Sequence, residues 1–328
     1  MDQTIREYAI ERPRAKWHEL KGKFDNLPET NFKLGCEFAG RGQYFDASLR
    51  FKFALYLQPS YTQAHYNLAS CYLQMNKHAQ ALTEFKKTLQ LDPTHRQARF
   101  MLSVLAPQSM PMDQLPKSMP PEMIIGFFTQ VAADYDRLAE TNQYQGPRLV
   151  AEACRPYLTK TTGLHLVDLG CGTGLIAKPW RSLCREILGV DVTPAMVAAS
   201  QVARSGDNPT YDRVLKEDIN AIAPGTFMPG ASDVVLCIDT AQFLGDLAPV
   251  FRLAATLLLP GGIFVLTTEQ ANPVYGFGVN PETGRFGHTD DYVRKSGAAA
   301  GLELKKDGRA PMYEGVNNQL FVFGKKAA

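Results

Sequence analysis

A group of closely spaced glycines, Gly170 to Gly174, is the strongest candidate for chemistry in this chain. The apolar run from Leu164 to Leu169 predicts a buried strand, and the segment Gly-Cys-Gly-Thr-Gly after it leads into a pattern that predicts a helix. Glycines let the backbone turn sharply and lie against a ligand, while amides at the start of a helix are free to donate. The segment therefore predicts a nucleotide-binding turn.

Two aspartates beside this turn indicate which nucleotide it would take. The run Ile187 to Val190 predicts a second strand, ending at Asp191, 21 residues after Gly170, where an acid can accept from both ribose hydroxyls. Asp168 directly precedes the turn, where it would repel a pyrophosphate but would pair with the ammonium of an amino acid moiety. The third glycine, Gly174, also comes one position early for a dinucleotide turn. These features favour S-adenosylmethionine over a nicotinamide dinucleotide.

Three segments, VDLGCGTG, GVDVTPAMV and LLLPGGIFVLTTE, together resemble the class I S-adenosylmethionine-dependent methyltransferases over about residues 122 to 328. The resemblance implies a Rossmann-like, seven-stranded α/β domain with strand order 3-2-1-4-5-7-6. Its active site would lie at the carboxyl ends of the strands. Residues 232–238 and 261–268 predict the fourth and fifth strands, and LELKKDGR and NNQLFVFG predict the C-terminal hairpin of this fold.

The resemblance also implies a set of cofactor-binding residues, for S-adenosylmethionine and its product S-adenosylhomocysteine. At the methionine end it implies Asp168, Gly170, Cys171, Gly172 and Gly174. At the ribose it implies Asp191, and the remaining contacts would be Tyr135, Val192, Met196, Asp218, Ile219 and Cys237. Taken alone, Met196 and Tyr135 could be core residues, and Asp218 could cap the short helix that follows it.

The first third of the chain contains two copies of one 34-residue unit, residues 28–61 and 62–95. Corresponding positions carry corresponding residue types, such as Phe51 with Phe85 and Pro59 with Pro93. Small residues let two helices approach closely and the prolines end the second helix, so each unit predicts a helical hairpin. The units resemble the tetratricopeptide repeat, which forms an all-α domain.

These patterns divide the chain into four segments. We expect an N-terminal helical extension (1–27), repeats with a capping helix (28–105), a proline-rich linker (106–121) and the methyltransferase domain (122–328). Apolar residues from Ile124 to Leu138 recur at helical spacing. The segments FFTQVAADYDRLAETNQYQGP and GRFGHTDDYV are similar to bacterial methyltransferases that carry an N-terminal tetratricopeptide domain. The repeats would serve either as a structural or dimerising solenoid or as a groove for a partner protein.

The residues that act on the methyl acceptor are expected near the ends of the fourth and fifth strands. His288 is expected in the loop after the fifth strand and is the candidate general base, because imidazole titrates near neutral pH; its alternative role is capping or packing. Asp239 is the second catalytic candidate, in a Cys-Ile-Asp-Thr segment that replaces the Asn-Pro-Pro-Tyr of amino-methylating DNA and release-factor enzymes. Further pocket candidates are Gln242, Glu269, Tyr275 and Arg285.

Composition excludes several other classes of protein. The chain has 35 Lys and Arg against 33 Asp and Glu, which gives no strong attraction for nucleic acid or an anionic membrane. No stretch approaches the roughly 18 apolar residues of a membrane span, and the N-terminal residues lack the apolar run of a signal peptide, so a cytoplasmic location is expected. The six cysteines include no Cys-x-x-Cys pair, and no magnesium-binding carboxylate set is evident, so no metal is expected.

The sequence therefore predicts a methyltransferase that acts on a small molecule, or on a partner that the repeats deliver. Two alternatives stay open: an adaptor that binds S-adenosylmethionine without catalysis, and a nicotinamide-dependent dehydrogenase. The acceptor atom is also open among oxygen, nitrogen, sulfur and carbon.

Overall fold

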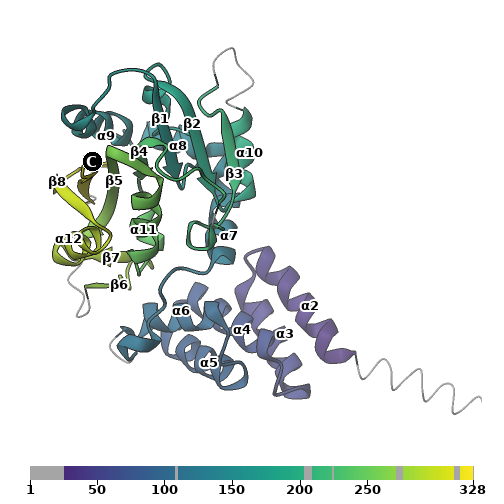
Figure 1. Ribbon diagram of the computed structural model, residues 1–328. Coiled ribbons are helices and arrows are strands. Elements are labelled where there is room, and N and C mark those ends of the chain that lie inside the picture. Colours follow the sequence, from purple (N-terminus) through teal and green to yellow (C-terminus); the bar gives the residue numbers. More distant parts are fainter. Residues whose placement is uncertain are drawn as a thin grey trace, which may run out of the picture. The chain divides into compact units, whose positions relative to one another are not determined.

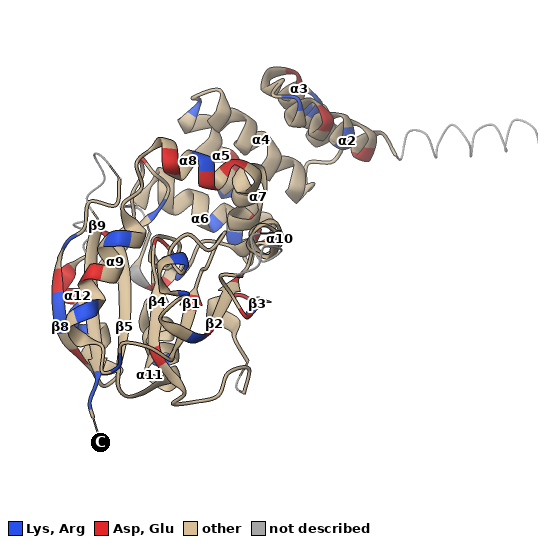
Figure 2. Ribbon diagram, turned by 90° about the horizontal axis from the view of Figure 1, so that it is seen from above, with Lys and Arg blue, Asp and Glu red and all other residues tan. Residues whose placement is uncertain are grey.

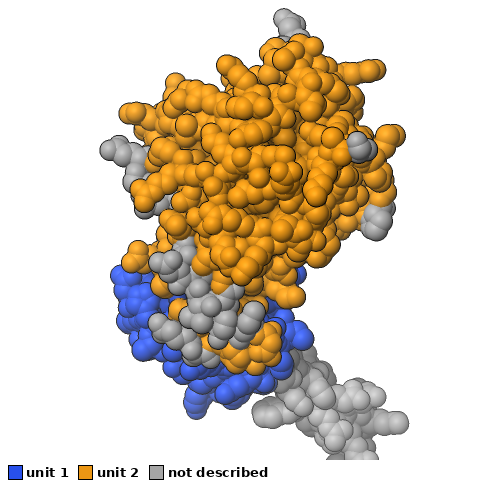
Figure 3. Space-filling model, turned by 60° about the vertical axis from the view of Figure 1, so that its left-hand side comes forward, with its two compact units in different colours: residues 1–106 blue, residues 107–328 orange. Residues whose placement is uncertain are grey.

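The computed structural model describes residues 26–107, 110–202, 209–223, 225–270, 276–313 and 318–327. The chain divides into two compact units, residues 1–106 and 107–328, coloured separately in Figure 3. The predicted N-terminal extension, residues 1–27, lies outside the described residues except for its last two positions.

The first unit is built from short helices joined by tight turns (Figure 1). Its described helices are α2 (Leu27–Gly40), α3 (Tyr44–Leu57), α4 (Thr62–Gln74), α5 (His78–Leu91) and α6 (Arg96–Leu105). Helix α2 packs on α3, and α4 packs on α5. The equivalent Phe51 and Phe85 are both fully buried. The two predicted hairpins are confirmed, since α3 and α5 each end two residues before their prolines.

The histidines of the repeats have structural contacts. His65 is buried, with Nδ1 2.6 Å from Glu84 Oε2 and Nε2 2.9 Å from the carbonyl oxygen of Pro59. It therefore ties α4 to α5 and to the turn after α3. His95 is the N-cap of α6, where its Nδ1 accepts from the amide of Ala98 across 3.2 Å.

The second unit is a mixed sheet whose main strands run in the order β3-β2-β1-β4-β5-β9-β8. These strands are β1 (Leu164–Leu169), β2 (Cys184–Asp191), β3 (Arg213–Lys216), β4 (Ser232–Cys237), β5 (Leu258–Gln270), β8 (Leu302–Arg309) and β9 (Asn318–Lys325). The first five are parallel, and β9 is antiparallel to both β5 and β8. Counted without the short strands β6 (Phe277–Val279) and β7 (Phe286–His288), this is the expected 3-2-1-4-5-7-6 order.

Two apolar clusters, one on each face, bury the sheet. Alternate residues of a strand point to opposite faces, so Leu166 belongs to one cluster and Val167 to the other. The first cluster includes residues of α9 (Gly146–Cys154), and the second those of α11 (Ala248–Leu257) and α12 (Asp290–Ala299). Helices on both faces of a mainly parallel sheet define the α/β class that the sequence predicted.

Two predicted helices differ from those in the structure. The chain after the glycine turn forms only one short 3-10 helix, η5 (Lys178–Trp180), because Pro179 cannot donate a backbone hydrogen bond. The helix expected from Ile124 to Leu138 is divided into α7 (Pro121–Val131), η3 (Ala132–Asp134) and α8 (Tyr135–Thr141). The segment that follows the glycines is therefore a series of turns, and no α-helix begins there.

Part of the proline-rich segment is hydrogen bonded within the second unit. The amide of Met119 donates to the carbonyl of Phe243 across 2.8 Å. The carbonyl of Lys117 accepts from the amides of Gly245 and Asp246, each across 2.9 Å. These bonds fix the start of α7 beside the loop that follows β4.

Charges of both signs are interspersed on α12 and β8 (Figure 2). Arg294 contacts both Asp290 and Asp307, and Lys295 pairs with Asp291. The outer surface of these two elements therefore has no single-sign face.

The cysteines, the apolar content of the helices and the grouping of possible metal ligands can be examined in the described residues. All six cysteines are free thiols, five of them buried. Across the described ranges, no helix combines the length and apolar content that crossing a membrane requires. The same residues contain no group of three or more His, Cys, Asp or Glu arranged to hold a metal ion.

Candidate functional site

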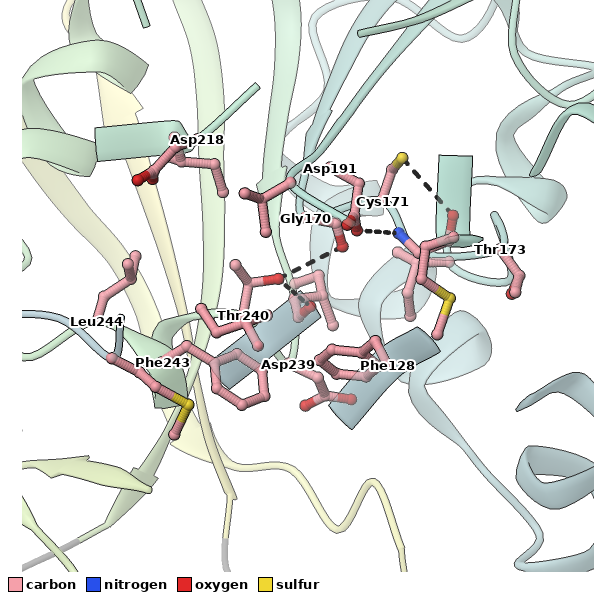
Figure 4. Close-up of a pocket in the computed structure, with 18 of the residues that line it drawn as sticks. Phe128, Gly170, Cys171, Thr173, Asp191, Asp218, Asp239, Thr240, Phe243 and Leu244 are labelled. Carbon is pink, nitrogen blue, oxygen red and sulfur yellow. Dashed lines mark hydrogen bonds between the residues drawn. The ribbon is translucent and has the colours of Figure 1, made fainter. Parts of the chain in front are cut away.

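A cavity opens at the carboxyl ends of β1, β2 and β4 (Figure 4). Nine of the twelve predicted cofactor-binding residues line it: Tyr135, Gly170, Cys171, Gly172, Asp191, Val192, Met196, Asp218 and Ile219. We call it the donor cavity. The other three, Asp168, Gly174 and Cys237, are outside its lining.

The glycine turn lies directly against neighbouring strands. The amides of Gly170 and Cys171 both donate to the carbonyl of Val190, across 2.8 and 2.9 Å. Gly170 has φ +80°, and a Cβ there would lie 2.1 Å from Oγ1 and 2.9 Å from Cβ of Thr240. Only glycine fits this position. At Gly172 a Cβ would meet nothing within 4 Å, so the backbone there faces open space.

Replacing Gly170 with alanine is expected to destabilise the protein more than the same change at Gly163. Both glycines have positive φ, +80° and +70°, which costs an alanine about 1–2 kcal/mol. At Gly163 the added methyl enters open space, whereas at Gly170 it overlaps Thr240 and costs about 1–3 kcal/mol more. Urea denaturation of both variants measures the difference, and equal losses of stability would contradict this account.

Asp191 ends β2 and holds the glycine turn in place. Its Oδ2 accepts from the amide of Gly172 across 2.9 Å, and its Oδ1 accepts from the amide of Thr193 across 2.8 Å. Burial raises the pKa of the Asp191 carboxyl, and these two backbone bonds oppose that shift. The same carboxylate lines the donor cavity, so it can accept further bonds from a ligand.

Asp168 directly precedes the turn and does not line the donor cavity. It is 2% exposed, and its Oδ2 accepts from the hydroxyl of Tyr211 across 2.8 Å. Burial raises its pKa to about 7, partly offset by the Tyr211 bond and reinforced by Asp191. A Cβ at Gly174 would lie 2.8 Å from the ring of Tyr211, and Cys237 is fully buried in β4. The predicted roles of these three residues at the cofactor stay predictions.

The opposite end of the donor cavity combines apolar side chains with one carboxylate. Met196 is 1% exposed, and it lines the cavity with Val192 and Ile219. Asp218 Oδ1 accepts from the amide of Asn220 across 2.9 Å and so caps the 3-10 helix η6 (Ile219–Ala221). Its predicted capping role is confirmed, and its side chain also borders the cavity. Such a surface suits a flat heterocycle with an exocyclic amine.

A second cavity adjoins the first within the same unit, and we call it the acceptor cavity. Its lining comes from α7 and α8, from the loop after β4, and from residues next to β7 and β9. Phe128, Tyr135 and Asp239 line both cavities, so they form a neck between them. Figure 4 shows Asp239 and Phe128 at the end of the donor cavity remote from Asp218.

Three side chains donate hydrogen bonds to the carboxylate of Asp239. Its Oδ2 accepts from the Tyr144 hydroxyl across 2.6 Å, and its Oδ1 accepts from Asn318 Nδ2 and Thr267 Oγ1 across 3.2 and 3.3 Å. Its φ of +51° is a left-handed conformation that aspartate rarely adopts. Burial raises its pKa. Strained backbone and a perturbed carboxyl at a cavity junction are features of functional sites.

Three tyrosines surround this carboxylate. The rings of Tyr144 and Tyr313 stack with centroids 4.6 Å apart. The Tyr135 hydroxyl is hydrogen bonded to that of Tyr313, and burial raises the pKa of Tyr313 to about 12. All three phenols therefore stay protonated near neutral pH, and the Tyr144 hydroxyl donates to Asp239.

Three of the four remaining pocket candidates, Gln242, Arg285 and Glu269, lie in or next to the lining of the acceptor cavity. Gln242 and Arg285 line it, and Arg285 Nη1 donates to Glu269 Oε1 across 3.1 Å. Tyr275 lies outside the described residues.

The structure corrects the expected position of His288. It is not in a loop but in β7, fully buried, with Nε2 2.8 Å from the carbonyl oxygen of Leu244 and 3.2 Å from that of Gly245. Nε2 must therefore carry the proton. Burial lowers the pKa of His288 to about 4, and it lines neither cavity. A buried imidazole of this kind is a weak base, and it does not line the cavity where a substrate would bind, so its placement favours the packing role.

Replacing His288 with glutamine is expected to reduce the loss of stability in acid. The folded-state pKa of about 4 lies below the unfolded value near 6.5, so between these pH values only the unfolded chain takes up a proton. The contribution of the neutral ring to the free energy of unfolding is fully present above pH 6.5. It falls by about 3 kcal/mol as the pH is lowered towards 4. Glutamine keeps a donor but does not titrate. The stability gap between wild type and H288Q, from urea denaturation, should narrow by that amount; a constant gap would contradict it.

Several residues of the two cavities were not predicted as site residues from the sequence. Phe128 was recognised only as part of a helical pattern, while Tyr144, Thr240, Tyr313 and Asn318 were not singled out. Thr240 directly follows the predicted Asp239, and this position is the one feature of the sequence that could have indicated Thr240 as a site residue. The others come from segments whose proximity depends on the tertiary fold.

Comparison with known proteins identifies both parts of the chain. Residues 167–266 match the methyltransferase domain family, and residues 62–95 match the tetratricopeptide repeat. The ubiquinone biosynthesis O-methyltransferase of Stutzerimonas stutzeri (strain A1501) is 32% identical over 120 residues, 36% of this chain and 50% of that protein. The enzyme of the same name from Xanthomonas euvesicatoria pv. vesicatoria is 30% identical over 113 residues, 34% of this chain and 45% of that protein.

The chain spans about half the length of the curated relatives it matches. Among solved structures, the cyclase SpnF resembles it with a TM-score of 0.52 and 16% identity, over 65% of this chain and 99% of that chain. This likeness shows the fold, and a shared fold does not fix the reaction. Taken together, the matched segments and the sheet order show a helical unit that contains a match to the tetratricopeptide repeat, followed by a Rossmann-like unit in which residues 167–266 match the methyltransferase domain family.

Proposed function

We propose that this protein transfers a methyl group from S-adenosylmethionine to a hydroxyl oxygen of a small molecule. The observation that carries the proposal is the neck, where Phe128, Tyr135 and Asp239 line both cavities. A donor in one cavity and an acceptor in the other would meet there. A protein that only binds the cofactor needs no second cavity opening onto it, so this arrangement favours catalysis over the adaptor alternative.

The residues of the donor cavity fit S-adenosylmethionine. Open space over Gly172 leaves room for a ligand against the turn, and the Asp191 carboxylate can accept from ribose hydroxyls. Val192, Met196 and Ile219 offer an apolar surface to adenine.

Asp239 would accept the proton that the acceptor hydroxyl loses. S-adenosylmethionine supplies the methyl group: its carbon–sulfur bond breaks as the carbon–oxygen bond forms, and the bonding electron pair remains on sulfur. Tyr144, Thr267 and Asn318 fix the carboxylate, and burial raises its pKa towards the range of a useful base. Phe128 and Tyr135 would exclude water from the neck.

Oxygen is favoured as the acceptor atom by the relatives. Both similar proteins are named O-methyltransferases, and the domain match covers the strands that form the donor cavity. A hydroxyl acceptor also requires a proton acceptor at the neck, which Asp239 supplies.

The repeats would bring a partner protein or a second copy of the chain. Helix α3 has exposed large apolar side chains one turn apart: Phe45, Leu49, Phe53 and Tyr56, from 47% to 81% exposed. An apolar stripe of this kind is typical of interaction surfaces. We place the protein in a bacterial cytoplasm, in keeping with its bacterial relatives.

Calorimetry with three ligands tests the proposed cofactor. We expect S-adenosylmethionine and S-adenosylhomocysteine to bind with dissociation constants in the micromolar range and NADH not to bind. Transfer of a labelled methyl group from S-adenosylmethionine to a panel of hydroxylated compounds then tests turnover. Binding without transfer to any compound would favour the adaptor, and binding of NADH alone would favour a dehydrogenase.

A further inference from the structure

We propose that the acceptor cavity selects acceptors without negative charge, and that Glu269 sets this preference by holding Arg285 in an ion pair. The inference rests on the proposed function, because it treats this cavity as the place where the methyl acceptor binds. It adds the chemical class of the acceptor and names a residue that determines specificity without contacting the neck.

The charges around the cavity sum to a net negative value. Among the described lining residues, only Asp239 and Arg285 are charged. Arg285 Nη1 donates to Glu269 Oε1 across 3.1 Å, and the Glu269 side chain is only 12% exposed. One guanidinium therefore faces two carboxylates, Asp239 and Glu269. An acceptor carrying a carboxylate or phosphate would meet this excess of negative charge and would lack a free cation to bind it.

One wall of the cavity is apolar. Phe127, Phe128, Val131 and Leu138, all from α7 and α8, line it. Phe127 and Leu138 are 52% and 39% exposed, unusually high for large apolar side chains. An uncharged acceptor with a ring or alkyl body would cover these side chains and be stabilised by removing them from water.

Asn318 points to a hydrogen-bond donor on the acceptor. It is 5% exposed and lines the acceptor cavity, and its Nδ2 donates to Asp239 Oδ1. Its own Oδ1 is buried and has no hydrogen-bond partner in the described structure. A buried carbonyl oxygen without a donor is unfavourable, and a ligand hydroxyl would satisfy it.

Two matched ligands test the preference: 4-hydroxycinnamic acid, ionised at pH 7.5, and its methyl ester. Their dissociation constants would be measured by ligand-detected NMR on the full chain with saturating S-adenosylhomocysteine. Wild type should bind the ester at least about tenfold more tightly than the acid. Glu269→Gln, which keeps a hydrogen-bond acceptor but frees the Arg285 charge, should tighten the acid about tenfold and change the ester less than about twofold.

Two further variants keep the test independent of folding. Arg285→Gln leaves Glu269 uncompensated and should weaken the acid further, in the opposite direction to Glu269→Gln. Glu303→Gln removes the same charge from the exposed partner of Lys305 on β8 and should change neither ligand. Thermal unfolding of each variant shows whether it is folded.

Three outcomes would overturn the proposal: wild type binding the acid as tightly as the ester, an acid-to-ester ratio unchanged in Glu269→Gln, or no binding of either ligand. The proposed function has a separate readout in the calorimetry with S-adenosylmethionine. If the charge preference is found but that ligand does not bind, the proposed function fails while the preference stands. If S-adenosylmethionine binds but the charge preference is not found, only the preference is discarded.

Discussion

Replacing Asp239 with asparagine is expected to lower kcat by about 10²–10⁴-fold, the range typical for loss of a general base. The amide keeps the size of the carboxylate and can still accept one bond from Tyr144 or Asn318, so the neck should retain its shape. The affinity for S-adenosylmethionine should stay within about threefold of wild type, because the contacts expected for that ligand centre on Asp191 and the glycine turn.

The pH profile separates a base from a merely structural residue. In wild type, kcat should fall in acid as Asp239 is protonated, at a pH above the ordinary range of an aspartate because burial raises its pKa. In D239N this acidic limb should disappear. Asp291→Asn, which removes an exposed carboxylate paired with Lys295, serves as the control. A D239N variant with kcat within threefold of wild type would show that another group takes the proton.

Replacing Asp191 with alanine is expected to abolish measurable binding of S-adenosylmethionine. The change removes an acceptor for the ribose hydroxyls, where two bonds to a charged group are worth about 3–6 kcal/mol, or about 10²–10⁴-fold in affinity. It also leaves the amides of Gly172 and Thr193 without their acceptor, so the glycine turn itself loses its support. Calorimetry with S-adenosylmethionine and S-adenosylhomocysteine measures the loss.

Asp191→Asn distinguishes loss of ligand contacts from loss of the turn. Its side-chain oxygen can keep one of the two backbone bonds, so its stability to urea should lie between those of wild type and D191A. Its affinity for S-adenosylhomocysteine should fall less than that of D191A. If D191A binds either ligand within threefold of wild type, Asp191 does not contact the ribose.

The glycine turn and Asp191 could be predicted from the sequence because they are close together in the chain, whereas the other predicted residues of the donor cavity came from the family resemblance. The glycines lie between two strands, and Asp191 ends the second, so the alternation of apolar run and turn places them together. The neck could not be predicted in this way. Asp239 and Tyr144 are 95 positions apart, and Asp239 and Asn318 are 79 apart, so only the folded sheet brings them into contact.

The errors at Pro179 and His288 have physical causes. The apolar pattern after Gly174 favoured a helix, but Pro179 and the short distance to β2 leave room for only a 3-10 turn. His288 was expected in a loop, but β5 extends beyond the end of β4, and its last residues, Glu269 and Gln270, pair with β7. Because β7 pairs with β5, His288 is buried in the core. The residues next to His288 in the sequence do not indicate this pairing.

A crystal structure of the protein with S-adenosylhomocysteine tests the central claim most directly, because the claim is that donor and acceptor meet at the neck. We expect the ribose hydroxyls on Asp191, the adenine against Met196 and Ile219, and the thioether sulfur directed towards Asp239 and the acceptor cavity. A ligand whose sulfur points away from Asp239, or one bound outside the donor cavity, would contradict the account.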